Sequence, residues 1–167
     1  MNKTESIQDS HIDIAYASSL KNAIHRSKQA DISIQDSLED DTIKIPNQIY
    51  LDEITRIKKS IQRDLMDAAH HMSEKGKELK DWLGFDIALI KSELWLNFTE
   101  ATDKTTLELL KLKQVAAKAP YHTGEIIGLG TLTCDQCNAS LHFHKPGHIP
   151  PCSKCHGTNF HRLNPNL

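Results

Sequence analysis

Four cysteines, the only ones in this chain of 167 residues, carry the side chains best suited to bind a metal ion. They form two Cys-x-x-Cys pairs, and this spacing lets two thiolates on one tight turn reach the same ion while nearby backbone N–H groups donate to the sulfurs. Two such turns supply the four corners of a tetrahedron. We therefore predict one structural Zn²⁺ site made of Cys134, Cys137, Cys152 and Cys155.

Other chemistry at these cysteines fits the pattern less well. Iron in a rubredoxin-like site uses the same four ligands and is the main alternative metal. Thioredoxin-type redox chemistry needs a Cys-x-x-Cys pair at a helix N-terminus in a βαβ unit, and neither pair has that setting. A hydrolytic zinc ion needs an open coordination position, whereas four thiolates close the shell. The sequence therefore predicts a protein that is not an enzyme.

Histidines are frequent in the same part of the chain. A second metal site or a pH-sensitive surface is one interpretation, and ordinary polar positions on strands and loops are the favoured one. An enzyme built on the histidine and carboxylate groups between Tyr121 and Glu125 is a weak third hypothesis, because no nucleophile, phosphate loop or cofactor motif accompanies them. The histidines that follow Pro120 are His122, His142, His144, His148, His156 and His161.

The segment around the cysteines predicts a small β structure. Leu141 and Phe143 alternate with histidines as in a half-buried strand, and Pro146-Gly147 offers a turn. With further strands near 126–132 and 159–163, this gives a zinc ribbon of about three short strands. So small a sheet buries too little apolar area to fold alone, and structural zinc contributes on the order of 10 kcal/mol.

The chain before Pro120 shows helical periodicity instead. We predict an amphipathic helix over about residues 4–30 and an irregular linker over 31–48. Apolar residues then recur at steps of three and four from Leu51 to Met72, and again from Phe85 to about Lys118. Two long helices joined by a short turn between Gly76 and Gly84 should pack as an antiparallel, coiled-coil-like hairpin.

Two details of the helices are also predicted. The threonine-rich stretch 99–106 contains modest helix formers that favour a kink or restart, but the second helix is predicted to continue through it as one element. The charged residues of the first one are expected to form a solvent-exposed face; they are Arg56, Lys59, Arg63, Asp67 and Glu74.

Charge and hydropathy narrow the classes of partner. The formal net charge is -2, and the basic stripe Arg56, Lys59 and Arg63 is interleaved with acids, so nucleic acid is possible as a partner but not supported by charge. We expect no membrane span and no secretory signal. Cysteines confined to metal-type pairs suit a reducing compartment, so the predicted location is the cytoplasm.

Particular stretches of the sequence resemble a bacterial family of zinc ribbon-containing proteins with a domain of unknown function. They are Ile90-Lys91-Ser92-Glu93-Leu94-Trp95, Thr102-Asp103-Lys104-Thr105 and the run from Tyr121 to Gly130, followed by the cysteine pairs. The similarity covers about residues 50–167, and His156 stands where a glycine would be commoner. The resemblance implies a helical N-terminal region, a C-terminal zinc ribbon and a bacterial cytoplasmic setting, with no established activity.

These expectations combine into an α+β fold: a long antiparallel helical hairpin with an additional N-terminal helix, followed by a small β zinc ribbon. The predicted divisions are 1–46, an N-terminal helical arm and linker, 47–120, the hairpin, and 121–167, the ribbon. The leading functional hypothesis is a non-enzymatic protein-interaction or adaptor module that binds a protein partner or forms a homo-oligomer through its helices. The alternative is a nucleic-acid-associated regulator of transcription or translation that uses the ribbon.

Overall fold

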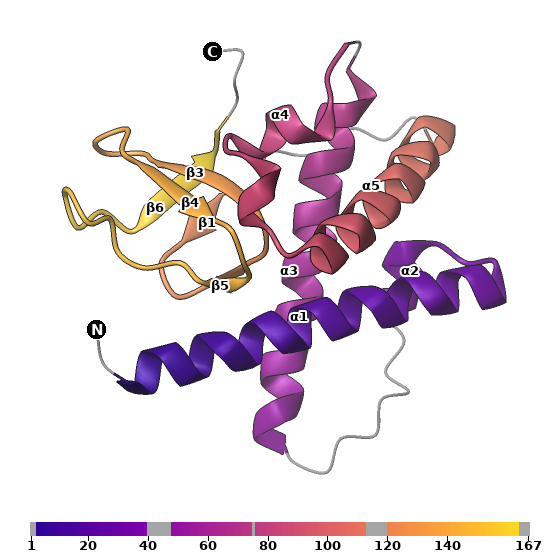
Figure 1. Cartoon of the computed structure of the whole chain (residues 1–167), viewed down its shortest axis with the longest axis horizontal. Helices are drawn as coiled ribbons and strands as arrows, with labels where there is room; N and C mark the ends of the chain where they lie inside the picture. Colours follow the sequence, from indigo (N-terminus) through magenta and orange to yellow (C-terminus); the bar gives the residue numbers. More distant parts are fainter. Residues whose placement is uncertain (1–2, 40–47, 75, 113–119, 164–167) are drawn as a thin grey trace.

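The protein is α+β, as predicted, with helices followed by antiparallel strands (Figure 1). The computed structural model describes residues 3–39, 48–74, 76–112 and 120–163. The helices are α1 (Lys3–Ala30), α2 (Ile34–Glu39), α3 (Gln48–Ser73), α4 (Leu79–Leu83), the 3-10 helix η1 (Ile87–Leu89) and α5 (Ser92–Leu112). The strands are β1 (Tyr121–His122), β2 (Ile126–Ile127), β3 (Gly130–Cys134), β4 (Ser140–Phe143), β5 (Gly147–His148) and β6 (Asn159–Arg162).

The predicted N-terminal helix is present as α1, which buries Ile12, Tyr16 and Leu20 completely, one turn apart. The prediction that an irregular linker follows this helix is wrong in part. Residues 34–39 form α2, because Ser33 accepts a hydrogen bond from the backbone N–H of Asp36 and so caps a short turn whose Ile34 and Leu38 enter the core. The rest of that predicted linker, 40–47, lies outside the described residues.

The two long predicted helices exist as α3 and α5, and they pack against each other. The prediction of a short turn between them is wrong, because α4 and η1 form this connection. The second long helix, α5, begins at Ser92 rather than at Phe85. Gly84 ends α4 in the left-handed conformation with φ 75°, and the Asp86 side chain caps η1 by accepting from the N–H of Ala88. Asp86 thus begins a short 3-10 helix where the sequence predicts the start of the second long helix.

The second helix runs through the threonine-rich stretch as one element, as predicted, since α5 is continuous from Ser92 to Leu112. The hydroxyl of Thr105 donates to the carbonyl of Ala101, and that of Thr106 donates to Thr102, each at 2.8 Å. These bonds to the preceding turn satisfy the hydroxyls within the helix. The predicted continuation to Lys118 lies outside the described residues.

The ribbon has more strands than the three expected. Four antiparallel strands pair in the order β1-β6-β3-β4, and β2 pairs separately with β5. In the main sheet Leu132 lies opposite Leu141 and Cys134 opposite Phe160. The residues expected to turn at Pro146-Gly147 lead directly into β5. The second, two-stranded sheet thus connects the segment before β3 with the segment before the second cysteine pair.

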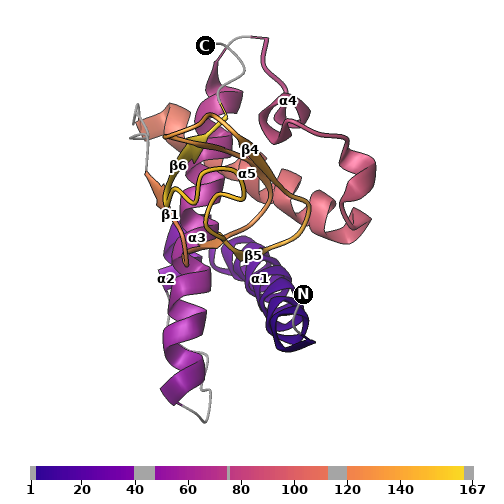
Figure 2. The same ribbon diagram turned by 90° about the vertical axis from the view of Figure 1, so that its left-hand side faces the viewer.

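The ribbon packs directly on the helices. Figures 1 and 2 show α1 crossing α3 and the strands lying against one side of these helices. Ile126 and Leu129 belong to the helical core, whereas Ile127 belongs to the ribbon core with Phe160. The chain therefore alternates between the two cores at β2. Among the described residues, no helix is long and apolar enough to cross a membrane.

Candidate metal centre

Two backbone turns of the same design present the four cysteines. In the first turn, which follows β3, the N–H of Asn138 donates to the carbonyl of Cys134 at 2.9 Å. In the second, the N–H of His156 donates to the carbonyl of Cys152 at 2.8 Å. Asn138 and His156 both have positive φ, 57° and 59°, at the position directly after the second cysteine of each pair. Each turn therefore directs two sulfurs to the same side.

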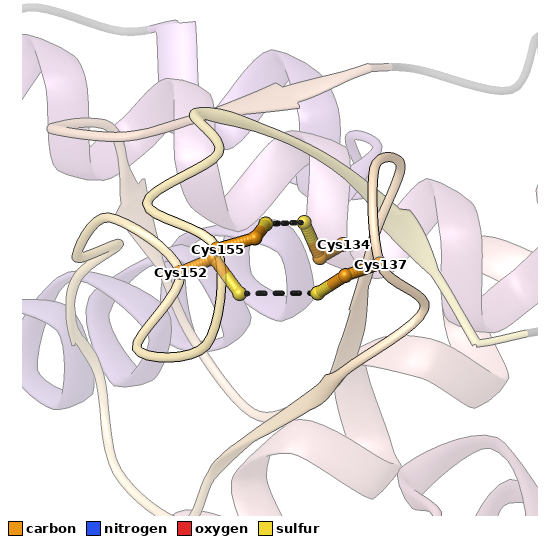
Figure 3. Close-up of side chains that lie close together, drawn as sticks. All are labelled: Cys134, Cys137, Cys152 and Cys155. Carbon is orange, nitrogen blue, oxygen red and sulfur yellow. Dashed lines mark hydrogen bonds between the residues drawn. The ribbon is translucent and has the colours of Figure 1, made fainter.

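The two turns bring all four sulfurs together (Figure 3). The Sγ atoms lie within 4.8 Å of one another, and the pairs Cys134–Cys155 and Cys137–Cys152 are each 3.6 Å apart. That separation is far longer than a disulfide bond of about 2.05 Å, and all four cysteines are free. A tetrahedron with Zn–S bonds of about 2.3 Å has sulfurs roughly 3.8 Å apart. The donor set therefore fits a tetrahedral metal ion.

The surroundings of Cys152 favour the thiolate, the form in which cysteine binds metal. Backbone N–H groups of Cys155 and Lys154 donate to the Cys152 sulfur and lower the pKa of that thiol to about 6. Cys134 and Cys152 are buried against Phe160 and Ile149 in the ribbon core. The four sulfur ligands therefore lie beside apolar side chains of the ribbon core, which is the setting of a structural metal site.

The histidines do not add a second metal site within the described parts of the chain, where only the cysteines form a group of three or more potential ligands. His142 lies 2.9 Å from the Thr131 hydroxyl, His122 is 3.1 Å from Glu125, and His161 is 2.5 Å from Asp135. The ring of His144 packs against Phe85. These four histidines have local polar or aromatic partners.

A buried ion pair that sequence reasoning missed joins the ribbon to the helices. Arg162 of β6 contacts Asp64 of α3 at 2.5 Å, with side chains only 11% and 0% exposed. The hydroxyl of Tyr16 and the backbone N–H of Gly128 donate to the other Asp64 oxygen, at 2.8 and 2.7 Å. Arg162 also donates to the carbonyl of Leu129 at 2.6 Å. One carboxylate thus holds α1, α3 and two parts of the ribbon.

Burial sets the protonation of this network. It raises the pKa of Tyr16 well above the ordinary phenol value, so the hydroxyl stays a donor to Asp64. It also raises the pKa of Asp67, which accepts a hydrogen bond from Tyr121. Burial opposes the charge of Arg162, but the neighbouring Tyr121 and the two carboxylates raise the pKa of Arg162 and keep it cationic. The network therefore combines charged and neutral polar groups, and these groups have hydrogen-bond partners within it.

The solvent-exposed face predicted for α3 is accordingly wrong at two positions. The side chain of Arg63 is 20% exposed, pairs with Glu125 at 2.7 Å and lies over the Tyr121 ring at 4.0 Å. Asp67 is 15% exposed and bonds Tyr121. The burial of Arg63 and Asp67 could have been predicted from the sequence, because they share with Ser60 one side of the helix, next to its apolar face.

Comparison with known proteins agrees with this geometry. Residues 19–164 match a family described as a zinc-ribbon containing domain, which extends the similarity well before residue 50. Over 113 residues the chain is 35% identical to the uncharacterised protein YbeL of Escherichia coli strain K12, covering 67% of this chain and 68% of YbeL. YbeL of Escherichia coli O157:H7 gives the same values. No solved structure matches the chain significantly.

The family match spans most of the described helices as well as the ribbon, and the four cysteines that meet in space all lie within it. Both the sequence similarity and the converging sulfurs therefore point to the same conclusion. The chain belongs to the family of proteins with a zinc-ribbon containing domain.

Proposed function

We propose that this protein is a non-catalytic, cytoplasmic zinc-binding protein whose helices recruit a protein partner, with one Zn²⁺ holding the ribbon in place. Four thiolates fill a tetrahedral coordination shell, which leaves no position for a substrate or an activated water. Iron would be bound by the same sulfurs. The metal's contribution is then to fold the ribbon, and through Arg162 the ribbon stabilises the helices.

The observation that carries the partner-binding proposal is an apolar face on α5 directed away from the core. Leu96, Leu107 and Leu110 are 67%, 59% and 56% exposed. They fall on one side of the helix, whereas Leu94 and Phe98 point into the core. Single exposed leucines are ordinary on protein surfaces, but three aligned on one helix face are typical of a docking surface.

Acidic residues between these leucines indicate the charge that the partner should carry. Glu100 and Asp103 lie on the same side of α5, between Leu96 and Leu107. Glu100 is paired with Lys28 of α1, while Asp103 is exposed and forms no ion pair in the described part of the chain. We propose that the partner presents an apolar helix face with a basic residue placed opposite Asp103.

A crosslinking experiment in the protein's own host tests this role. A photoreactive residue at position 107 should crosslink to one protein, resistant to nuclease, and Leu110→Ser should abolish the crosslink. Ile87→Ser, which removes an exposed apolar side chain from η1, is the matched control and should leave it intact. Crosslinks only to a second copy would replace the heterologous partner with a homo-oligomer. Recovery of nucleic acid or nuclease-sensitive partners would contradict the proposal and favour a nucleic-acid regulator.

A further inference from the structure

A cleft between α3 and the loop that joins β1 to β2 is separate from the metal centre and from the α5 face. Its volume is about 370 Å³, within the range of small-molecule sites. Figure 2 shows α3 running beside this part of the ribbon. The lining residues are Arg56, Lys59, Ser60, Arg63, Gly124, Glu125 and Ile126.

Positive charge predominates in this cleft, although the chain as a whole is slightly acidic. Arg56, Lys59 and Arg63 face a single carboxylate, Glu125. Glu125 forms an ion pair with Arg63, with an N–O distance of 2.7 Å. Neither Arg56 nor Lys59 forms an ion pair among the described residues. Within the parts of the chain that the structure describes, two cations on one wall of this concave site therefore have no counter-charge, and they attract an anion.

Helix geometry makes these cations converge. Positions 56, 59 and 63 follow one another at steps of three and four, so their side chains leave α3 on the same side. That side faces the Gly124 loop because Arg63 donates to the carbonyl of Ile126 at 3.0 Å and thereby fixes the ribbon against the helix. The acids one turn earlier, Asp52 and Glu53, do not line the cleft.

Two further features suit a ligand with several acceptor oxygens. The Nε–H of Arg63, one of the residues that line the cleft, is buried and has no hydrogen-bond partner. Gly124 has φ 88°, and no atom lies within 4 Å of the position where its Cβ would be, so the loop leaves open space here. Guanidinium groups match the planar pairs of oxygens on a phosphate, and a lysine adds a point charge.

We propose that this cleft binds the phosphate monoester group of a small molecule about the size of a mononucleotide, with Arg56 and Lys59 as the principal ligands and Arg63 supporting them. Ile126 supplies an apolar edge beside the charged wall. The same phosphate chemistry occurs in nucleic-acid backbones, which are a different source of the ligand. The proposal goes beyond partner binding through α5 and does not depend on it.

The test is a titration of the zinc-bound, full-length protein followed by NMR of the backbone amides at constant ionic strength. Inorganic phosphate and adenosine monophosphate should each shift the amides of Gly124, Glu125 and residues 56–63 saturably, whereas chloride should not. Arg56→Gln combined with Lys59→Gln should weaken adenosine monophosphate binding by about tenfold or more. Both side chains are exposed, so this variant should fold normally.

A matched variant controls for net charge. The double variant Lys21→Gln, Lys28→Gln also removes two positive charges, here from exposed positions on α1, and should leave the affinity for adenosine monophosphate unchanged. Absence of saturable shifts with both phosphate ligands would overturn the proposal. So would equal weakening by the two double variants, because that would reflect overall charge only. An oligonucleotide that binds through the cleft when both small phosphates fail would also overturn it, in favour of nucleic acid.

Discussion

Arg162 in the last strand lies 2.5 Å from Asp64 in the middle of α3, although 98 residues separate them in the chain. This ion pair is almost entirely shielded from water, and its remaining donors and acceptors are used by Tyr16, Gly128 and Leu129. It joins the ribbon to the helices, and Arg162 also lies 3.6 Å from a second carboxylate of α3, that of Asp67.

Replacing Arg162 by methionine should therefore be strongly destabilising. The variant leaves the Asp64 carboxylate buried without its counter-charge, and breaking a buried pair in this way costs about 3–5 kcal/mol. Chemical denaturation followed by circular dichroism measures the change in the free energy of unfolding. Lys80→Met, which removes an exposed partner of Glu78, is the control and should change it little. A loss of similar size in both variants would refute the role given to Arg162.

Gly128→Ala should disrupt the same network from the ribbon side. A Cβ at this position would lie 2.2 Å from the Tyr16 hydroxyl oxygen and 2.6 Å from Asp64, distances that require both side chains to move. Such overpacking costs roughly 1–3 kcal/mol. Tyr16→Leu removes the hydroxyl and also Cζ, which would lie 2.5 Å from the added Cβ, so the double variant should lose less than the sum of the two single losses. Additive losses measured in the same denaturation assay would argue against this contact.

His156→Gly should stabilise the ribbon. His156 has φ 59°, a conformation that costs a residue with a Cβ about 1–2 kcal/mol and costs glycine much less. The greater freedom of glycine in the unfolded chain offsets part of this gain, so we expect a net increase of about 0.5–1 kcal/mol in the free energy of unfolding with zinc present. A decrease would show that the imidazole has a stabilising contact that outweighs its backbone strain.

The interface between Arg63 and Glu125 should weaken in acid. Burial opposes ionisation of Glu125, but hydrogen bonds from Arg63 and His122 outweigh it and lower the pKa of this carboxyl. A lowered pKa in the folded state stabilises the protein above the unfolded value of about 4.3, and this contribution is lost as the pH falls through the folded value. The stability difference between the wild type and Glu125→Gln should therefore be largest near neutral pH.

Denaturation of both proteins at a series of pH values, with zinc present, measures that difference. It should shrink once the pH falls below about 4.3. A difference that stays constant from neutral to acidic pH would mean that the charge of Glu125 does not contribute to the interface.

The convergence of the four cysteines could be predicted from the sequence, because each Cys-x-x-Cys pair lies within one local turn and its spacing is typical of metal ligands. The helices α1 and α3 could be foreseen because their apolar residues keep one period. In contrast, α4 was missed because Gly76 and Gly84 were interpreted as the two ends of one turn, and η1 was missed because its residues were assigned to the second long helix. A periodic pattern alone does not show where a helix ends.

The attachment of the ribbon could not be foreseen. Asp64 and Arg162 each follow a polar residue and precede a leucine, so nothing in the local sequence distinguishes them from surface charges until the fold brings them together. The cleft beside them has the same origin, since Arg56 and Lys59 become a concave site only when the Gly124 loop lies opposite α3. Contacts between distant residues carry no periodic signal in a single sequence.

Native mass spectrometry of the purified protein tests the central claim most directly, because it gives the identity and number of metal ions on a folded chain. The wild type should carry one zinc ion, and a variant with Cys152→Ser and Cys155→Ser should carry none and show a ribbon without dispersed amide signals in NMR. A wild-type protein that folds its ribbon without metal, or a variant that retains zinc, would contradict the account.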